Sequence, residues 1–239
     1  MKEVLNNIAA HLGYAVVPAW RQPGMAQATL TGQLLRHHQV DLVLDVGANA
    51  GQYHDFLRLE AGYEGEVVSF EPQPDLAERL NARAAADPRW KVHHLALGSA
   101  DAELALNVMH RGEFSSFLQP DNTGQPQFAD LNRVRQTVAV PVKRLDAIEL
   151  PASDRLFLKA DTQGFDLEVI RGASGILPRV KVIQTEVCVQ PIYKGMPRYR
   201  DVLAELEGLG FSPAGFFAVS RSADMAAIEF DCLLVRRED

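Results

Sequence analysis

Cysteine and long apolar runs are scarce in this sequence. The 239 residues include only two cysteines, Cys188 and Cys232, and these lack the spacing of metal ligands. Both lie inside apolar runs, so we interpret them as buried, unbonded side chains on neighbouring strands in a reducing compartment. No stretch approaches about 18 consecutive apolar residues, so we expect no membrane-spanning helix. The N-terminal segment lacks the apolar core of a secretory signal, which favours a cytoplasmic protein.

Positive charge is also in short supply. The chain has 24 Lys and Arg against 31 Asp and Glu, a formal net charge of -7. Without a long basic cluster, this balance argues against a nucleic-acid partner. The composition is 47% hydrophobic, which is ordinary for a soluble globular chain. We expect one domain over residues 1–239, in which residues 1–38 form a helical N-terminal cap or extension that covers the site or joins a second copy in a homodimer.

Strand and helix patterns alternate along most of the chain. Apolar runs predict strands at 42–46, 66–72, 91–98, 137–145, 155–161 and 181–189, with a further strand or an edge hairpin at 103–109. Helical patterns occur within 1–38, where Pro18 and Pro23 break them, and at 52–61, 75–86, 166–172 and 199–209. The two last runs, FFAVS and IEFDCLLVRR, predict an antiparallel pair.

This order predicts a doubly wound α/β fold with a mostly parallel sheet and helices on both faces. A ligand of such a fold binds at the carboxyl ends of the strands. Residues 110–136 show no clear periodicity and predict a long loop, with a possible short helix at 129–135.

The segment DLVLDVGANAGQYHDFL, residues 41–57, is the most informative local pattern. Gly47 and Gly51 flank a tight exit from the first strand, where glycine lets the backbone turn sharply and lets a ligand approach it. The following helix would point its N-terminal N–H groups at that ligand. The alternative is a strand–helix turn with a purely structural role.

The same segment argues against a dinucleotide site. An NAD-linked oxidoreductase needs G-x-G-x-x-G, whereas Gly47 and Gly51 form G-x-x-x-G. Glu71 ends the second strand about 20 residues further on, where an acid can accept hydrogen bonds from both hydroxyls of a ribose. These two features together predict a nucleoside site.

Six segments, in this order, resemble the FkbM-type methyltransferases, a branch of the S-adenosylmethionine-dependent class I enzymes: DLVLDVGANAGQY, VVSFEPQP, LALGSADAELALNV, SSFL, LKADTQGFDLEVIRGA and TEVCVQPIYKG. The resemblance implies a seven-stranded sheet with an antiparallel C-terminal strand and S-adenosyl-L-methionine as cofactor. It also implies methyl transfer to a hydroxyl oxygen of a sugar, glycan, polyketide or similar small metabolite. A non-catalytic nucleoside-binding module on the same sheet is the alternative.

The resemblance also implies positions for the cofactor. It places the methionine part among Asp45, Gly47, Asn49 and Gly51, the ribose on Glu71, the adenine along Ala96, Leu97 and Ser99, and the sulfonium beside Asp161. At Gln163 the family usually has an acid, so this position departs from its pattern.

Methyl transfer to a hydroxyl requires an oriented oxygen and a group that takes its proton. Asp161 is the first candidate for the base, although it would also suit the sulfonium charge or a purely structural role. His110 is the candidate among the histidines, and Glu186 is a carboxylate that could face the substrate; we expect Lys159 to form an ion pair, with Glu186 as its partner. For contacts to the methyl acceptor we expect Ser115, Ser116 and Phe117 of the long loop and Tyr193. We expect no metal.

Overall fold

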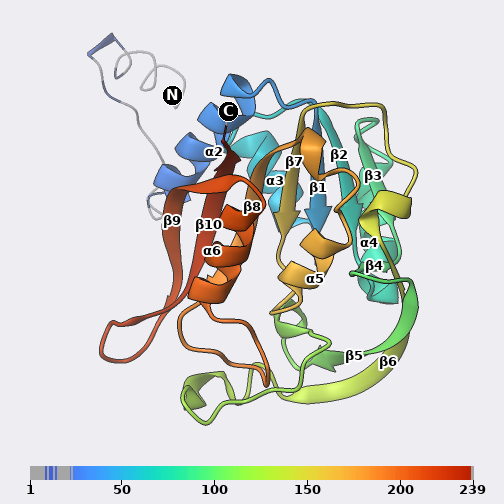
Figure 1. The fold of residues 1–239 in the computed structure, drawn as a ribbon, viewed down its shortest axis with the longest axis vertical. Helices are drawn as coiled ribbons and strands as arrows, with labels where there is room; N and C mark the ends of the chain where they lie inside the picture. Colours follow the sequence, from blue (N-terminus) through green and yellow to red (C-terminus); the bar gives the residue numbers. More distant parts are fainter. Residues whose placement is uncertain (1–8, 10, 13, 15–21, 23, 238–239) are drawn as a thin grey trace.

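A computed structural model of the chain describes residues 24–237, together with residues 9, 11, 12, 14 and 22. The predicted breaks at Pro18 and Pro23 lie outside these residues. The main sheet has seven strands in the order β3-β2-β1-β7-β8-β10-β9 (Figure 1). Its strands are β1 (Leu42–Val46), β2 (Glu66–Phe70), β3 (Trp90–His93), β7 (Leu156–Ala160), β8 (Val180–Cys188), β9 (Phe211–Arg221) and β10 (Ala227–Arg236).

Strands β3, β2, β1, β7 and β8 are parallel, and β10 runs antiparallel to both of its neighbours. This arrangement confirms the predicted doubly wound, seven-stranded fold with antiparallel strands at the C-terminus. Cys188 and Cys232 lie on the neighbouring strands β8 and β10, and both are buried and unbonded, as expected.

Helices cover both faces of this sheet, and this explains why the central strands are apolar on both sides. The helices are α2 (Met25–His37), α3 (Gln52–Leu59), α4 (Pro74–Ala84), α5 (Asp166–Arg171) and α6 (Tyr199–Gly208). Leu57 of α3 packs with Val43 and Phe157 on one face. Leu206 of α6 packs with Leu44 and Leu158 on the other.

A second sheet has three strands in the order β4-β6-β5: β4 (Ala96–Leu97), β6 (Val134–Lys143) and β5 (Ala102–Met109). It lies beyond the carboxyl ends of β1 and β7 (Figure 1). Of the two options for 103–109, the structure shows the hairpin, because β5 pairs antiparallel with β6.

Two predictions for this region were wrong. The single strand predicted at 91–98 is divided between the two sheets, because β3 ends at His93 and Ala96 pairs with Val142 of β6. The predicted helix at 129–135 is replaced by a short 3-10 turn at Pro126–Phe128 and by the start of β6 at Val134. The first residues of β6 are exposed, so backbone pairing with β5 holds this end of the strand, and no apolar pattern marks it.

In the part of the chain that the structure describes, no helix has both the length and the apolar character needed to cross a membrane.

Candidate active site

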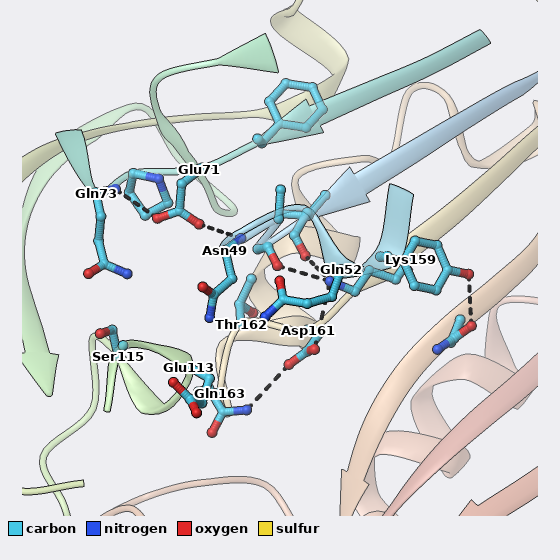
Figure 2. A pocket seen from close by; sticks show the side chains of 18 of the residues that line it. Asn49, Gln52, Glu71, Gln73, Glu113, Ser115, Lys159, Asp161, Thr162 and Gln163 are labelled. Carbon is cyan, nitrogen blue, oxygen red and sulfur yellow. Dashed lines mark hydrogen bonds and ion pairs between the residues drawn. The ribbon is translucent and has the colours of Figure 1, made fainter. Parts of the chain in front are cut away.

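A cavity of about 480 Å³ opens at the carboxyl ends of β1, β2 and β7. Its wall includes the turn after β1, the residues that follow β2 and β7, the strand β4, and side chains from α2, α3, β8 and β10. Figure 2 shows Glu71 and Gln73 on one side of Asp161 and Lys159 on the other. This is the edge of the sheet at which the sequence predicted a ligand site.

The turn after β1 depends on glycine at position 47. Gly47 has φ +77°, and a Cβ atom there would lie 2.0 Å from the backbone oxygen of Asp161. A side chain is therefore excluded by the backbone of Asp161, directly after β7, as well as by the left-handed conformation. Gly47 and Asn49 line the cavity. Gly51, with φ +87°, begins α3 and faces Leu80 and Arg83 of α4.

Glu71 follows β2 and is 2% exposed. Its Oε2 accepts a hydrogen bond from the backbone N–H of Asn49 at 2.8 Å, and its Oε1 accepts one from the N–H of Gln73 at 2.8 Å. Burial raises the pKa of Glu71 to about 7, although the two N–H donors lower it in part. The carboxylate faces the cavity and keeps lone pairs for a further donor.

Lys159 joins the turn after β1 to β7. Its Nζ lies 3.1 Å from Asp45 Oδ1 and 3.7 Å from Asp161 Oδ2, and it donates to the backbone oxygen of Gly47 at 2.9 Å. The expected ion pair is present, but Asp45 and not Glu186 is its close partner. The register of β1 against β7 places Asp45 directly beside Lys159.

Asp45 itself has no exposed surface and accepts a hydrogen bond from Ser69 at 3.0 Å. It does not line the cavity. Lys159 does line the cavity, so the charge of Asp45 acts on the cavity through its ion pair with Lys159.

Gln163, the position that departs from the family pattern, joins several candidate residues. Its Nε2 lies 3.3 Å from Asp161 Oδ1 and 3.3 Å from Glu186 Oε2. Asp161 and Gln163 line the cavity, whereas Glu186 is buried behind them. Burial, and then the charge of Glu229, raise the pKa of Glu186 well above its ordinary value.

The long loop contributes two of its expected residues to the cavity, Ser115 and Phe117. Phe117 packs on the cluster that contains Ala96, and Ala96 and Leu97 also line the wall. Ser116 is buried and donates to the backbone oxygen of Gln163 at 2.7 Å. The structure thus places Phe117 on the cluster that contains Ala96, one of the residues expected to contact adenine.

Besides Asp45, Gly51, Ser116 and Glu186, three more of the predicted residues do not line the cavity. His110 is exposed, and its backbone N–H bonds to Arg133. Ser99 is exposed and donates to Glu168. Tyr193 is buried, with its hydroxyl 2.7 Å from the backbone oxygen of Phe114 and 3.0 Å from Gln163 Oε1.

Several residues of the wall were not expected from the sequence: Gln27, Tyr53, Phe56, Gln184 and Asp231. They come from α2, α3, β8 and β10, which meet only in the folded chain. A polar residue inside an apolar strand was the one available signal for Gln184 and Asp231, since such a group needs a partner. Within the described ranges, no group of three or more His, Cys, Asp or Glu side chains has the arrangement of a metal site.

The sheet order, the glycine turn and the acid after β2 together define a class I methyltransferase domain. The chain matches the methyltransferase FkbM domain over residues 45–213, and it belongs to this family. Its methyl donor is S-adenosylmethionine, the cofactor of the class. The residues present fit such a cofactor, because Glu71 offers a buried carboxylate to a ribose and the cavity wall is acidic toward a positive sulfonium.

Two solved structures illustrate the similarity. Methyltransferase FkbM from Methylobacillus flagellatus KT has 15% identity and a TM-score of 0.51, over 82% of this chain and 43% of that chain. This chain therefore spans less than half of that protein's length. Magnesium protoporphyrin IX methyltransferase from Synechocystis PCC 6803 has 11% identity and a TM-score of 0.49, over 91% of this chain and 81% of that one. No protein of curated function matches the chain.

Proposed function

We propose that this chain transfers a methyl group from S-adenosylmethionine to a hydroxyl oxygen of a sugar, glycan, polyketide or similar small metabolite. The observation that carries the proposal is that the Gly47 turn, the Glu71 carboxylate and Asp161 face a single cavity. A carboxylate can accept hydrogen bonds from both ribose hydroxyls, which gives Glu71 its role.

We assign the other residues of this wall to the adenine and to the methionine part of the cofactor. Ala96 and Leu97 would border the adenine, and Phe117, which packs on the cluster that contains Ala96, would lie on the same side. Gly47 and Asn49 would contact the methionine part through the backbone of the turn.

The bound cofactor supplies an activated methyl group on a positive sulfur. The chain's own residues must orient the hydroxyl and take its proton. Asp161 is the carboxylate placed for this role, because it lies in the wall between Glu71 and Lys159 and is held by Lys159 and Gln163 (Figure 2). Burial raises the pKa of Glu186, which lies behind the wall, and His110 lies outside it.

Methyl transfer can be measured as formation of S-adenosylhomocysteine with a panel of glycan and polyketide acceptors. We expect Asp161→Asn to lower turnover by about 100-fold or more, with the affinity for S-adenosylhomocysteine unchanged within about twofold. Asp130→Asn, on an exposed aspartate outside the cavity, is the matched control and should change neither.

Two results would count against this function. Binding of S-adenosylhomocysteine without methyl transfer to any member of the panel would favour a nucleoside-binding module. Equal losses of turnover and affinity in Asp161→Asn would make Asp161 a structural residue.

A single domain over residues 1–239, a cap formed by residues 1–38 and a homodimer stay predictions. Gln27 of α2 forms part of the cavity wall, which supports a covering role for the N-terminal region. Sedimentation velocity of the purified chain would test the homodimer, and a single monomeric species would contradict it.

A further inference from the structure

The cavity extends beyond Asp161, on the side away from Glu71. This part of the wall is formed by Gln27 of α2, Tyr53 and Phe56 of α3, Gln184 of β8 and Asp231 of β10. None of these residues belongs to the glycine turn or to the segment after β2. The extension therefore offers space that the proposed nucleoside site does not explain.

Two hydrogen-bonded pairs line this extension. Gln27 Nε2 donates to Asp231 Oδ2 at 2.8 Å, and the Tyr53 hydroxyl donates to Gln184 Oε1 at 2.8 Å. Burial raises the pKa of Tyr53 well above its ordinary value, so the phenol keeps its proton. Amide, phenol and carboxyl groups in one wall can both donate to and accept from hydroxyl groups.

An aromatic surface lies beside these polar groups. The rings of Tyr53 and Phe56 are stacked, with centroids 5.4 Å apart and an interplanar angle of 27°. Small-molecule sites commonly combine such an apolar surface with a few polar groups that fix orientation. A ring that carries several hydroxyls has both an apolar face and a polar edge, and it matches this wall.

The charges of the extension select against anions. Glu60, Asp161 and Asp231 face it, and Lys159 is the only lysine or arginine among the cavity-lining residues in the described part of the chain. Lys159 is already paired with Asp45 at 3.1 Å. A phosphate or carboxylate on the methyl acceptor would therefore meet like charges without a free cation.

In-line methyl transfer requires the acceptor oxygen to approach from the side opposite the sulfur. The nucleoside and the methyl acceptor therefore need separate spaces that meet at the reacting centre. With the ribose on Glu71 and Asp161 at the centre, the remaining space is the extension between α2, α3, β8 and β10.

We propose that this extension is the subsite for the methyl acceptor, and that it takes a molecule with several hydroxyl groups and no negative charge, oriented by Gln27, Tyr53, Gln184 and Asp231. The proposal rests on the function proposed above. It assigns Ser115 and Phe117 to the nucleoside side and not to the acceptor.

The test uses the purified full chain with two kinds of acceptor: methyl glycosides of neutral hexoses, and hexose phosphates. Methyl transfer gives KM and turnover, and calorimetry with S-adenosylhomocysteine gives cofactor affinity separately. In one wall pair, Asp231→Asn removes the negative charge of the hydrogen-bond acceptor, and Gln27→Ala removes the donor amide. The matched control is Glu229→Gln, because Glu229 lies two residues earlier on the same face of β10 but does not line the cavity.

We expect methyl transfer to neutral glycosides and none to the phosphates. Asp231→Asn should raise KM by at least about tenfold and Gln27→Ala by several-fold, with the affinity for S-adenosylhomocysteine within about twofold of the parent. Glu229→Gln should leave KM unchanged. Because Gln27 lies on the half-exposed helix α2, its variant keeps the test valid if Asp231→Asn does not fold.

The outcomes separate this inference from the proposed function. Normal cofactor affinity with no transfer to any neutral glycoside, a preference for phosphates, or an unchanged KM in both variants would overturn the subsite and leave the cofactor assignment intact. Loss of S-adenosylhomocysteine binding in the parent chain would instead overturn the proposed function.

Discussion

The two parts of the cavity are built in different ways. The part around Glu71 is shaped by the backbone: Gly47 makes a left-handed turn, and the N–H groups of Asn49 and Gln73 hold the carboxylate. The part between α2 and β10 is shaped by side chains, such as Gln27 and Asp231, from elements distant in sequence. From this difference we expect that substitutions in the second part change the choice of methyl acceptor without disturbing the turn proposed to bind the cofactor.

The strongest test of this comparison is Lys159, because it lies where the two parts meet. Lys159→Met leaves Asp45 buried with an uncompensated charge, so we expect the free energy of unfolding to fall by about 3–5 kcal/mol. Urea denaturation followed by circular dichroism measures this loss. Asp45→Asn in the same chain should restore part of it.

Lys143→Met is the matched control for this effect. Lys143 pairs with Asp101 at 3.1 Å, but both side chains are about half exposed, so the loss should be much smaller than at Lys159. Equal losses at the two lysines would show that the Lys159 ion pair does not hold the two parts together.

Substitutions at two glycines test whether the backbone of the turn determines the affinity for S-adenosylhomocysteine. Gly47→Ala forces a Cβ against the backbone of Asp161 in a left-handed conformation, so we expect the affinity for S-adenosylhomocysteine to fall by about 100-fold, or about 2.7 kcal/mol. Gly112→Ala lies in the same cavity wall, but its Cβ would meet nothing within 4 Å. Calorimetry should show no change there. Similar affinities for both variants would contradict a backbone-built nucleoside site.

The smallest predicted effect concerns pH. Because burial raises the pKa of Glu71 to about 7, the carboxyl is largely protonated at pH 6 and ionised at pH 8. The ionised form accepts ribose hydroxyls, so affinity for S-adenosylhomocysteine should be about tenfold higher at pH 8 than at pH 6. Glu71→Gln should remove this dependence, and a parent profile that is equally flat would exclude the ribose role.

The same group has a predictable effect on stability. The ordinary pKa of a glutamate carboxyl is 4.5, so between pH 4.5 and about 7 the folded chain holds a proton on Glu71 that the unfolded chain has lost. The contribution of Glu71 to stability is therefore greatest below pH 4.5 and falls as the pH rises toward 7. Comparing the parent chain with Glu71→Gln by urea denaturation across this range isolates the contribution.

Much of the fold follows from local patterns. The buried strands β1 and β7 are short apolar runs, and glycine after β1 predicts a turn of the kind observed. The division at 93–96 could not be predicted, because pairing with β6, and not a change in the apolar run, separates β4 from β3. The exposed start of β6 likewise has no apolar pattern, and this caused the wrong helix prediction at 129–135.

For the site as well, local patterns could be predicted from the sequence, but contacts between distant elements could not. Gly47, Asn49 and Glu71 lie within one stretch of chain, so the sequence could place them at a common ligand. The Asp45–Lys159 pair depends on the register of β1 against β7, which the sequence does not reveal. Gln27 and Asp231 meet because the N-terminal helix α2 packs near the C-terminal strands, and no local spacing records that contact.

The most direct test of the central claim is a crystal structure of this chain with S-adenosylhomocysteine. The account predicts the ribose hydroxyls within hydrogen-bond distance of Glu71 and the sulfur beside Asp161, with the space between α2 and β10 left for the methyl acceptor. A nucleoside bound in that space, or a Glu71 carboxylate that contacts only Asn49 and Gln73, would contradict it.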